Sequence, residues 1–340
     1  MRVLQVMAGA RRGGAEAFFA RLVPALARAG VEQAAAIRPH AAREATLAEA
    51  GVPVATLRFG GPLDRLTPLR LRRLAARFRP DLVLSWMNRA TRAVPRGDYV
   101  HVGRLGGYYD LKYYRHCDWL VANTENLVAH ILAGGWPRAR ARYLPNFVAD
   151  APAPAASRAA LDTPGDAPLL FALGRLHRNK AFDVLLDALA ALPGVWLWLA
   201  GDGPEAAALR ARAARLGVSG RVRFLGWRDD TAALFAAADV FVCPSRHEPL
   251  GNVVIEAWAQ RRTVVAAAAQ GPSALIEPGA SGLLAPVDDG RALADEIRRL
   301  LDDPARAARL AEAGRRAFEA RFAEPVVVRR WLDFFAEAVG

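Results

Sequence analysis

The chain has 340 residues, of which 53% are apolar, and it carries 46 basic and 34 acidic side chains, a net charge of +12. This length exceeds what one hydrophobic core usually holds, so we expect two domains of roughly 150 residues each. Ordinary glycine and proline contents and only two cysteines exclude a collagen-like chain, a disordered chain and a disulfide framework. Neither a membrane-spanning apolar run nor a secretion signal is found, and a cytoplasmic protein is expected.

The positive charge is concentrated in the first half of the chain. Residues 1–150 contain 23 basic and 11 acidic side chains, whereas the remainder is balanced. The first half is therefore expected to meet an anionic surface or ligand. Nearly all the basic residues are arginines, and the only lysines are Lys112 and Lys180. Because an ammonium is a compact point charge, a lysine kept in such a sequence indicates a specific contact.

Short β-rich runs alternate with helical segments along the whole chain, which predicts an α/β fold with parallel sheets covered by helices on both faces. Strands are predicted at residues 3–7, 34–37, 54–57, 82–85, 99–104 and 119–122 and, in the second half, at 169–173, 195–200, 222–225, 240–242 and 263–266. The proline-containing residues 150–157 are typical of a linker. Residues 325–340 place Val327, Trp331 and either Phe334 or Phe335 on one helical stripe, so this helix should pack against the protein.

The first strand runs into a glycine-containing turn that precedes a helix over residues 17–29. Backbone N–H groups at the start of a helix form a site for an anion. Gly13 and Gly14 are therefore candidates for contact with a phosphate. A tight strand-to-helix turn is the alternative.

Arg175 and Lys180 lie between the strand at 169–173 and the next helix. Open α/β sheets bind ligands at the carboxyl ends of their strands, so these two cations can converge on one point there. Two cations suit a diphosphate. Solvated loop charges remain the alternative for this segment taken alone.

Residues 201–206 satisfy the Gly-x-Gly-x-x-Ala form of the dinucleotide-binding fingerprint. That fingerprint also requires an acidic residue about 20 positions later, at the end of the next strand. The strand at 222–225 ends without one. The sequence therefore does not favour NAD binding.

The most specific segment runs from Glu248, in a loop, to Glu256, on a helix that begins near Asn252. The backbone N–H groups of Leu250, Gly251 and Asn252 can face an anion. Since carboxylates repel a diphosphate, the two glutamates are expected to accept hydrogen bonds from the hydroxyls of a sugar and a ribose. The segment predicts a nucleotide sugar, with a charged helix cap as the alternative.

These motifs together resemble the retaining glycosyltransferases of the GT-B fold, glycosyltransferase family 4. The resemblance covers nearly the whole chain and rests on residues 13–16, Arg175 with Lys180, residues 201–203, residues 224–227 and the E-x7-E segment from Glu248 to Glu256. It implies two Rossmann-like domains that face each other across a cleft. Residues 1–149, with a returning helix at 325–340, would form the acceptor side, and residues 150–324 would bind the nucleotide sugar.

The resemblance also implies the roles of individual residues. Arg175 and Lys180 would hold the donor diphosphate, Glu248 would contact the transferred sugar and Glu256 the ribose. Further donor contacts would come from Gly13, Gly14, Trp227, Arg228, Leu250, Gly251 and Asn252. No cofactor and no metal are implied: the donor is itself a substrate, no Asp-x-Asp motif is present and the histidines show no ligand spacing. Catalysis would be electrostatic, and a front-face reaction without a covalent nucleophile is suggested.

The chain departs from the family pattern at several positions. Ala181 and Phe147 stand where glycines are usual, and residues 261–263 replace a usual Gly-x-Pro. These departures look tolerable.

A further departure concerns the acceptor side. Many members carry a histidine where a strand of the first domain ends, whereas this chain has Arg104 there and His101 three residues earlier. Either residue could take the histidine's place. Arg104, Tyr108 and Tyr109 are predicted to line the acceptor pocket.

A basic helix is predicted over residues 67–79, with Arg70, Arg73 and Arg77 on one face. These arginines form the solvated side of an ordinary sheet-covering helix or, alternatively, a patch that rests on anionic lipid.

We thus expect a metal-independent, hexosyltransferase-type enzyme that moves a sugar from a nucleotide diphosphate sugar to an acceptor hydroxyl in lipopolysaccharide or other cell-envelope glycan synthesis. Its expected partners are the donor, a glycan or lipid-linked acceptor and an anionic membrane at the inner face of the plasma membrane, without nucleic acid. The alternatives are a two-domain nucleotide-sugar epimerase and a basic nucleic-acid-binding protein.

Overall fold

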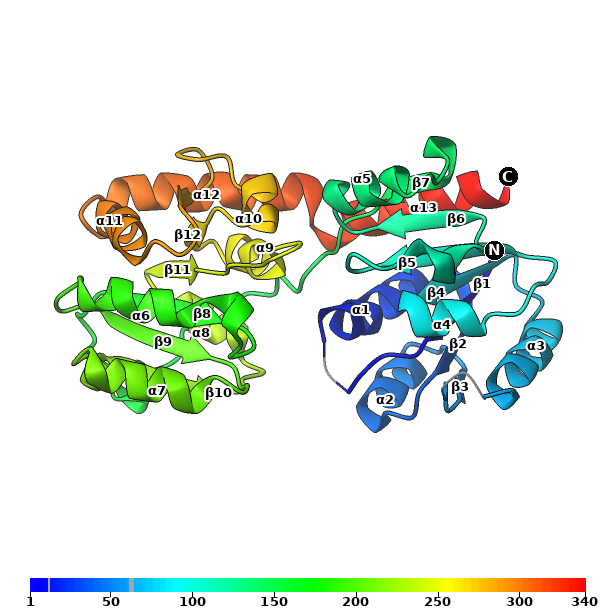
Figure 1. Cartoon of the computed structure of the whole chain (residues 1–340), viewed down its shortest axis with the longest axis horizontal. Coiled ribbons are helices and arrows are strands. Elements are labelled where there is room, and N and C mark those ends of the chain that lie inside the picture. Colours follow the sequence, from blue (N-terminus) through cyan, green and yellow to red (C-terminus); the bar gives the residue numbers. More distant parts are fainter. Residues whose placement is uncertain (12, 61–63) are drawn as a thin grey trace. The chain divides into compact units, whose positions relative to one another are not determined.

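The computed structural model describes residues 1–11, 13–60 and 64–340, and these form two compact units. The first unit consists of Met1–Phe147 and Glu324–Gly340, and the second of Val148–Ala323. The chain therefore leaves the first unit at Phe147 and returns to it with its last helix, drawn in red in Figure 1.

The first unit contains a seven-stranded parallel sheet in the order β3-β2-β1-β4-β5-β6-β7. The strands are β1 (Arg2–Met7), β2 (Glu32–Ile37), β3 (Val54–Thr56), β4 (Leu82–Trp86), β5 (Val100–Leu105), β6 (Trp119–Ala122) and β7 (Ala141–Tyr143). The strand order changes direction between β1 and β4, which is where ligands of such sheets bind.

Helices cover both faces of this sheet. They are α1 (Gly14–Arg28), α2 (Ala41–Glu49), α3 (Leu66–Phe78), α4 (Met87–Ala93), α5 (Glu125–Ala133) and α13 (Glu324–Val339), with the short 3-10 turns η1 (Leu111–Tyr114) and η2 (Arg138–Arg140). Apolar residues of α1, α2 and α13 share one core with the sheet, and those of α3, α4 and α5 pack on its other face. The predicted stripe of α13 is buried, and Phe334 meets Trp119 edge to face.

The second unit contains a six-stranded sheet in the order β10-β9-β8-β11-β12-β13, again with all its strand pairs parallel. The strands are β8 (Leu169–Leu173), β9 (Trp196–Ala200), β10 (Val222–Gly226), β11 (Val240–Cys243), β12 (Thr263–Ala267) and β13 (Leu283–Ala285). Most of these strands are continuous apolar runs, as expected for a sheet covered on both faces.

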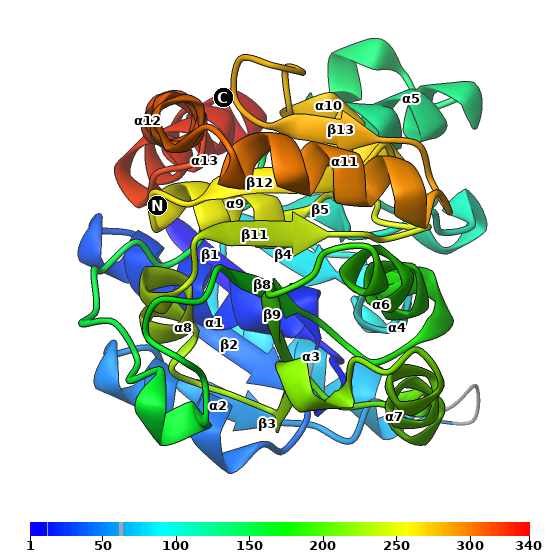
Figure 2. The ribbon, with the colours of Figure 1, turned by 90° about the vertical axis from the view of Figure 1, so that its left-hand side faces the viewer.

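The helices of the second unit also form two layers, which Figure 2 shows on either side of the sheet. They are α6 (Phe182–Ala190), α7 (Ala206–Arg215), α8 (Thr231–Ala237), α9 (Asn252–Ala259), α10 (Gln270–Leu275), α11 (Gly290–Leu301) and α12 (Pro304–Arg321), with η3 (Ala159–Leu161), η4 (Arg178–Lys180) and η5 (Ser219–Arg221). Residues of α6, α7 and α11 share one core, and residues of α8, α9 and α12 share the other.

The α/β architecture with parallel sheets is confirmed. Each of the eleven predicted strands overlaps an observed strand, and the prediction missed β7 and β13. Among the described residues, none of the helices combines the length and apolar character needed to cross a bilayer.

Candidate functional site

The two loops with the most specific sequence motifs flank the point where the second sheet changes direction. From β8 the chain continues to β9 and β10 on one side, and then crosses to β11, which pairs with the other side of β8. The loop after β8 carries Arg175 and Lys180, and the loop after β11 carries Glu248. Ligands of open parallel sheets bind at such a point, outside the carboxyl ends of the strands.

Lys180 and Glu248 form an ion pair between these two loops. Their side chains are only 22% and 11% exposed. Ser245 Oγ and the Gly251 amide each approach a Glu248 carboxylate oxygen at 3.4 Å. Burial disfavours the charged ammonium, but the carboxylates of Glu248 and Glu256 outweigh this effect and raise the pKa of Lys180. The lysine is therefore held as a cation at neutral pH.

Backbone geometry fixes the two loops to each other. The His247 amide donates to the Asn179 carbonyl over 3.1 Å, which joins the loop after β11 to the turn that ends in Lys180. The Lys180 stem passes close to Gly174, since a Cβ on that glycine would lie 3.4 Å from Lys180 Cε. Arg175, the next residue, is exposed.

The start of α9 supplies the remaining groups of the E-x7-E segment. Gly251 caps the helix in a left-handed conformation with φ of 82°, which favours glycine. Leu250 is buried, and Asn252 is the first helical residue. Glu256 follows one turn later and is half-buried. Its charge acts on Lys180, so both glutamates of the motif face the same cation.

Gly201 and Gly203 have a structural explanation. A Cβ on Gly201 would lie 1.8 Å from the Gly174 carbonyl oxygen, and one on Gly203 would lie 2.4 Å from the Leu176 carbonyl oxygen. The Leu176 amide also donates to the Asp202 carbonyl over 3.0 Å. These glycines therefore allow the loop after β9 to pack against the loop that carries Arg175.

Trp227 and Arg228 follow β10, at the same edge of the sheet but two strands away from β8. Trp227 is 54% exposed, and its indole N–H donates to Asp229 over 2.9 Å. Arg228 is paired with Asp230. An exposed indole can stack on a nucleotide base, but this contact remains a prediction.

In the first unit, Gly13 and Gly14 begin α1 after β1. The carboxylate of Glu16 folds back over this turn, where it accepts the Ala10 amide over 2.6 Å. A Cβ on Gly13 would lie 2.3 Å from Glu16 Oε2, so the glycine leaves room for this carboxylate. Gly13 thus has a local structural role, and the contact of both glycines with phosphates remains a prediction.

Arg104, at the carboxyl end of β5, is only 1% exposed. Its guanidinium lies 4.8 Å from the Phe18 ring and 4.5 Å from the Trp86 ring. Nη2 donates to Asn146 Oδ1 over 2.5 Å, whereas Nε and Nη1 are buried without a hydrogen-bond partner in the described part of the chain. Burial is the main cause that lowers the pKa of Arg104 to about 9.

The other predicted acceptor-side residues lie in different environments. Tyr108 is 41% exposed and Tyr109 is half-buried. His101 is buried within β5, where Nε2 lies 2.9 Å from Ser85 Oγ. His101 therefore sits inside the sheet and not at its carboxyl edge, which leaves Arg104 as the residue at the strand end.

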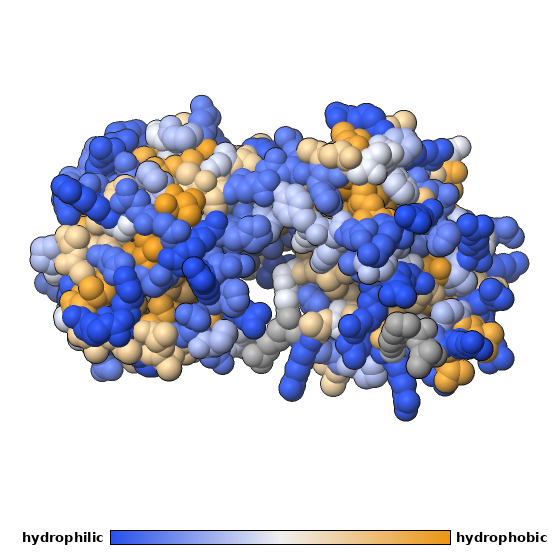
Figure 3. All heavy atoms as spheres, in the orientation of Figure 1, coloured by the Kyte–Doolittle hydropathy of each residue, from blue (hydrophilic) through white to orange (hydrophobic). Residues whose placement is uncertain are grey.

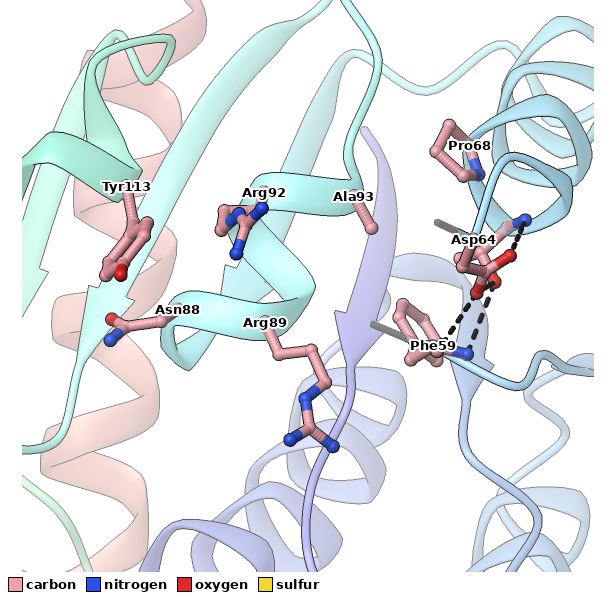
Figure 4. Close-up of a pocket in the computed structure, with 10 residues that line it drawn as sticks. Phe59, Asp64, Pro68, Asn88, Arg89, Arg92, Ala93 and Tyr113 are labelled. Atoms are coloured by element: carbon pink, nitrogen blue, oxygen red, sulfur yellow. Dashed lines mark hydrogen bonds between the residues drawn. The ribbon is translucent and has the colours of Figure 1, made fainter. Parts of the chain in front are cut away.

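A cavity of about 460 Å³ lies between α3, α4 and η1 of the first unit. Figure 4 shows Arg89 and Arg92 of α4, Tyr113 of η1 and Asp64 before α3 around it. Asp64 accepts the Thr67 amide over 3.0 Å and so caps α3, while the Arg92 guanidinium lies 5.3 Å from the Tyr113 ring. The cavity thus contains charges of both signs.

The predicted basic helix is α3, and Arg70, Arg73 and Arg77 are exposed on it. Leu66 and Leu69 at its start are also exposed, by 62% and 43%. Figure 3 shows apolar and strongly hydrophilic side chains next to each other over this helix. The sequence prediction had not included the two leucines.

No group of three or more potential metal-ligating side chains occurs within residues 1–11, 13–60 and 64–340. The two cysteines are buried and free, and burial raises the pKa of Cys243 to about 11. Neither thiol is therefore a reactive nucleophile at neutral pH.

Two family models match the chain. Residues 12–151 match the model described as Glycosyltransferase Family 4, and residues 167–303 match the model described as Glycosyl transferases group 1. A lipopolysaccharide core biosynthesis glycosyltransferase of Rhizobium meliloti, LpsE, is 41% identical over 95% of this chain and 96% of its own length. The chain belongs to glycosyltransferase family 4. A second Rhizobium meliloti protein with the same description, LpsD, is 36% identical to this glycosyltransferase over its whole length and 99% of the relative.

Solved structures show that this glycosyltransferase has the GT-B fold, with two Rossmann-like domains. Anabaena HepE in complex with UDP superposes with a TM-score of 0.86 at 22% identity and covers 99% of this chain and 100% of its own. A glycosyltransferase from Rickettsia africae superposes with a TM-score of 0.89 at 17% identity, covering 99% and 98%. The family resemblance and the predicted fold class are thus confirmed.

Proposed function

We propose that this glycosyltransferase binds a nucleotide diphosphate sugar at the carboxyl edge of its second sheet, through Arg175, Lys180, Glu248 and Glu256. The observation that carries the proposal is the Lys180–Glu248 pair, which lies where the sheet changes direction. A cation and two carboxylates match a donor that brings a diphosphate and several hydroxyls. The bound UDP and UDP-glucose in the HepE structures support a donor of this class.

Catalysis by these residues would be electrostatic. When the bond between the sugar and the diphosphate breaks, negative charge grows on the leaving phosphate oxygens. Arg175, Lys180 and the amides at the start of α9 would stabilise that charge. Glu248 and Glu256 would orient the sugar and the ribose by accepting hydrogen bonds from their hydroxyl groups. The acceptor proton would pass to the leaving phosphate, and the anomeric configuration would be retained.

The acceptor we propose is a glycan of the cell envelope, of the lipopolysaccharide core type. The support is the near full-length similarity to LpsE and LpsD, both described as enzymes of lipopolysaccharide core biosynthesis. The charge of the first unit agrees with an anionic acceptor. Residues 1–147 and 324–340 carry 25 basic and 13 acidic side chains, whereas residues 148–323 carry 21 of each.

A thermal-shift panel of nucleoside diphosphates and their sugars tests the donor proposal. A ligand at 100 times its dissociation constant stabilises the folded protein by about 2.7 kcal/mol, which raises the melting temperature by several degrees. We expect one nucleotide to do so, and Lys180→Ala to abolish the shift. Arg316→Ala, which removes an exposed cation of α12 in the same unit, should leave it intact. A full shift in Lys180→Ala would contradict the proposed site.

We also propose that transfer needs no divalent metal, because Arg175, Lys180 and the start of α9 supply positive charge for the diphosphate. Turnover in excess EDTA should remain largely intact. Loss of turnover that Mg²⁺ or Mn²⁺ restores would reject this proposal.

The first unit is further proposed to dock on an anionic membrane through α3. Within the described residues Arg70, Arg73 and Arg77 take part in no ion pair, and the exposed Leu66 and Leu69 lie on the same helix. Each basic residue near such a surface contributes about 1 kcal/mol, so a few are enough for reversible binding.

Co-sedimentation with liposomes tests this docking. The protein should bind vesicles that contain phosphatidylglycerol but not neutral phosphatidylcholine vesicles, and binding should fall steeply with salt. The triple variant Arg70→Glu, Arg73→Glu and Arg77→Glu should be released. The matched triple variant Arg291→Glu, Arg309→Glu and Arg316→Glu in the second unit should still bind. Equal binding of both triple variants would show that α3 is not the docking face.

A further inference from the structure

A second cavity of the first unit, of about 800 Å³, lies at the carboxyl ends of β1, β2 and β3. Its volume is in the range of small-molecule sites. Basic side chains dominate its lining, and each belongs to a segment that follows one of these strands. They are Arg11 after β1, Arg38, His40 and Arg43 after β2, and Arg58 after β3.

The four arginines of this cavity are not neutralised by ion pairs, and three of them are accessible to an anion. None of them takes part in an ion pair within the described part of the chain. Arg43 is 5% exposed and is fixed by a hydrogen bond of 3.2 Å from Nη2 to the Ala10 carbonyl. Arg38 is half-buried, while Arg11 and Arg58 are exposed.

The carboxylates next to this cavity accept hydrogen bonds from backbone amides. Glu16, which acts electrostatically on Arg43, accepts the Ala10 amide over 2.6 Å. Glu44 accepts the His40 amide over 2.8 Å. The four arginines outnumber these two carboxylates, so the cavity keeps an excess of positive charge. The cavity of Figure 4 differs in this respect, because Asp64 lines it together with its arginines.

On the basis of the proposed function, in which the second unit holds the donor, we propose that this cavity binds the acceptor sugar through an oxyanion that the sugar carries, a carboxylate or a phosphate. Arg38 and Arg58 are its expected partners. A guanidinium presents two parallel N–H groups that match both oxyanions. Pro39, Ala41 and Ala42 add apolar lining against which a sugar ring can pack.

Binding of matched monosaccharides to the intact protein tests this proposal without turnover. Saturation-transfer NMR titrations would compare glucuronate, glucose 6-phosphate and glucose, and UDP would be titrated separately by calorimetry. We expect at least one of the two acids to bind about 10-fold more tightly than glucose. Arg38→Gln and Arg58→Gln should each weaken that binding about 10-fold, since each removes a charge-assisted contact. Arg77→Gln, which removes an arginine of α3 outside this lining, should have no effect.

The outcomes separate this proposal from the donor proposal. Preference for glucuronate assigns the site to a carboxylate, and preference for glucose 6-phosphate assigns it to a phosphate. If glucose binds as well as the acids, if no acid binds, or if Arg38→Gln and Arg58→Gln behave like Arg77→Gln, the acceptor site is overturned. A parallel loss of UDP affinity in Arg38→Gln and Arg58→Gln would also overturn it. Acid binding without a thermal shift by any nucleoside diphosphate or nucleotide sugar of the panel would leave this site standing while the donor proposal fails.

Discussion

The second unit pairs its largely buried cation with a carboxylate, whereas the first unit places its buried cation between aromatic rings. Lys180 contacts Glu248, and the two carboxylates around it raise its pKa. Arg104 stacks on Phe18 and Trp86 and has no ion pair within the described residues, and burial lowers its pKa to about 9. The fold around Glu248 thus depends on its cation, whereas no buried carboxylate of the described residues is paired with Arg104.

The carboxyl edges of the two sheets also differ in how their arginines are paired with carboxylates, although both units share the parallel-sheet architecture. In the second unit Arg246 is paired with Asp183 and Arg228 with Asp230, and among the described residues Arg175 at this edge has no ion pair. In the first unit the edge cavity collects arginines without ion pairs in the described part of the chain. We therefore expect the topology to determine where a ligand binds and the pairing of charges to determine which ligand is suited.

The largest expected effect comes from removing the paired cation. Lys180→Ala should lower kcat/KM about 30-fold to 1000-fold, equivalent to roughly 2–4 kcal/mol, because it removes positive charge from the leaving diphosphate. Glu256→Ala should act similarly through the donor. Lys180→Ala should also destabilise the second unit, since Glu248 is left buried without its cation. Steady-state kinetics and thermal unfolding measure the two effects.

The other lysine provides a matched control for this experiment. Lys112 is about half exposed in its pair with Asp110, so Lys112→Ala should change neither activity nor stability appreciably. The double variant Lys180→Met with Glu248→Gln should regain stability but not activity, because neither buried charge remains. Near-native activity in both Lys180→Ala and Glu256→Ala would remove these residues from the donor site.

The strands that the sequence failed to predict are short edge strands. β7 (Ala141–Tyr143) and β13 (Leu283–Ala285) have three residues each and end their sheets. Runs of this length carry too little periodicity to be separated reliably from loops, and of the three three-residue edge strands only β3 (Val54–Thr56) was predicted. The longer strands were found because they are buried on both faces and therefore read as apolar runs.

The sequence indicated the residues of the donor motif but not how they contact each other. From strand ends and loop glycines, the sequence predicted that Lys180 and Glu248 lie at one edge of the sheet. Their direct pairing accompanies a backbone hydrogen bond between Asn179 and His247, which the sequence did not indicate. The arginine cavity was missed because Arg38 and Arg58 belong to different segments, and in an arginine-rich chain each looks like an ordinary surface residue. The burial of Arg104 was equally hidden, since a charged residue is rarely buried without a partner.

A smaller effect should distinguish the two units in acid. Burial is the main cause that lowers the pKa of His101 to about 4, from 6.5. Between these values the unfolded chain binds a proton that the folded first unit does not, so stability falls as pH falls from 6.5 to 4. The total loss approaches about 3 kcal/mol. Asp183 in the second unit has a pKa below its ordinary value, held down by Arg246 against the effect of burial, and so titrates only in stronger acid.

Hydrogen exchange at pH 7 and pH 5, corrected for the intrinsic rate and resolved by unit, measures this difference. Protection should fall more in residues 1–147 than in residues 148–323. His101→Gln should flatten the pH dependence of the first unit. An equal loss of protection in both units, or an unchanged pH dependence in His101→Gln, would contradict the assignment to His101.

Removal of the buried Arg104 cation should change the stability of the first unit only slightly. Arg104→Met should leave the stability of the first unit within about 1 kcal/mol. It loses the contacts with Phe18 and Trp86 and the hydrogen bond to Asn146, but it also removes a buried charge whose hydrogen bonds are incomplete. Chemical denaturation compares this variant with Lys180→Met, in which a buried carboxylate remains. If Arg104→Met proved as destabilising as Lys180→Met, the contrast between the two cations would be wrong.

The smallest effects concern two left-handed residues, one in each unit. Arg79 caps α3 with φ of 50° and is exposed, whereas Ala181 precedes α6 with φ of 52° and is fully buried. A left-handed backbone conformation destabilises an ordinary residue by about 1–2 kcal/mol, and a substitution by glycine relieves this strain. Glycine also makes the unfolded chain more flexible, which lowers the stability of the folded state by roughly 0.4–1 kcal/mol. Arg79→Gly should therefore stabilise the first unit by about 0.5–1 kcal/mol. Ala181→Gly also loses a buried methyl worth about 0.8 kcal/mol, so its net change should be close to zero.

Denaturation of both variants, with Ala188→Gly inside α6 as a destabilising control, checks this order. A gain for Ala181→Gly larger than that for Arg79→Gly would show that the methyl does not offset the strain, and that alanine at this position, where the family usually has glycine, weakens the second unit.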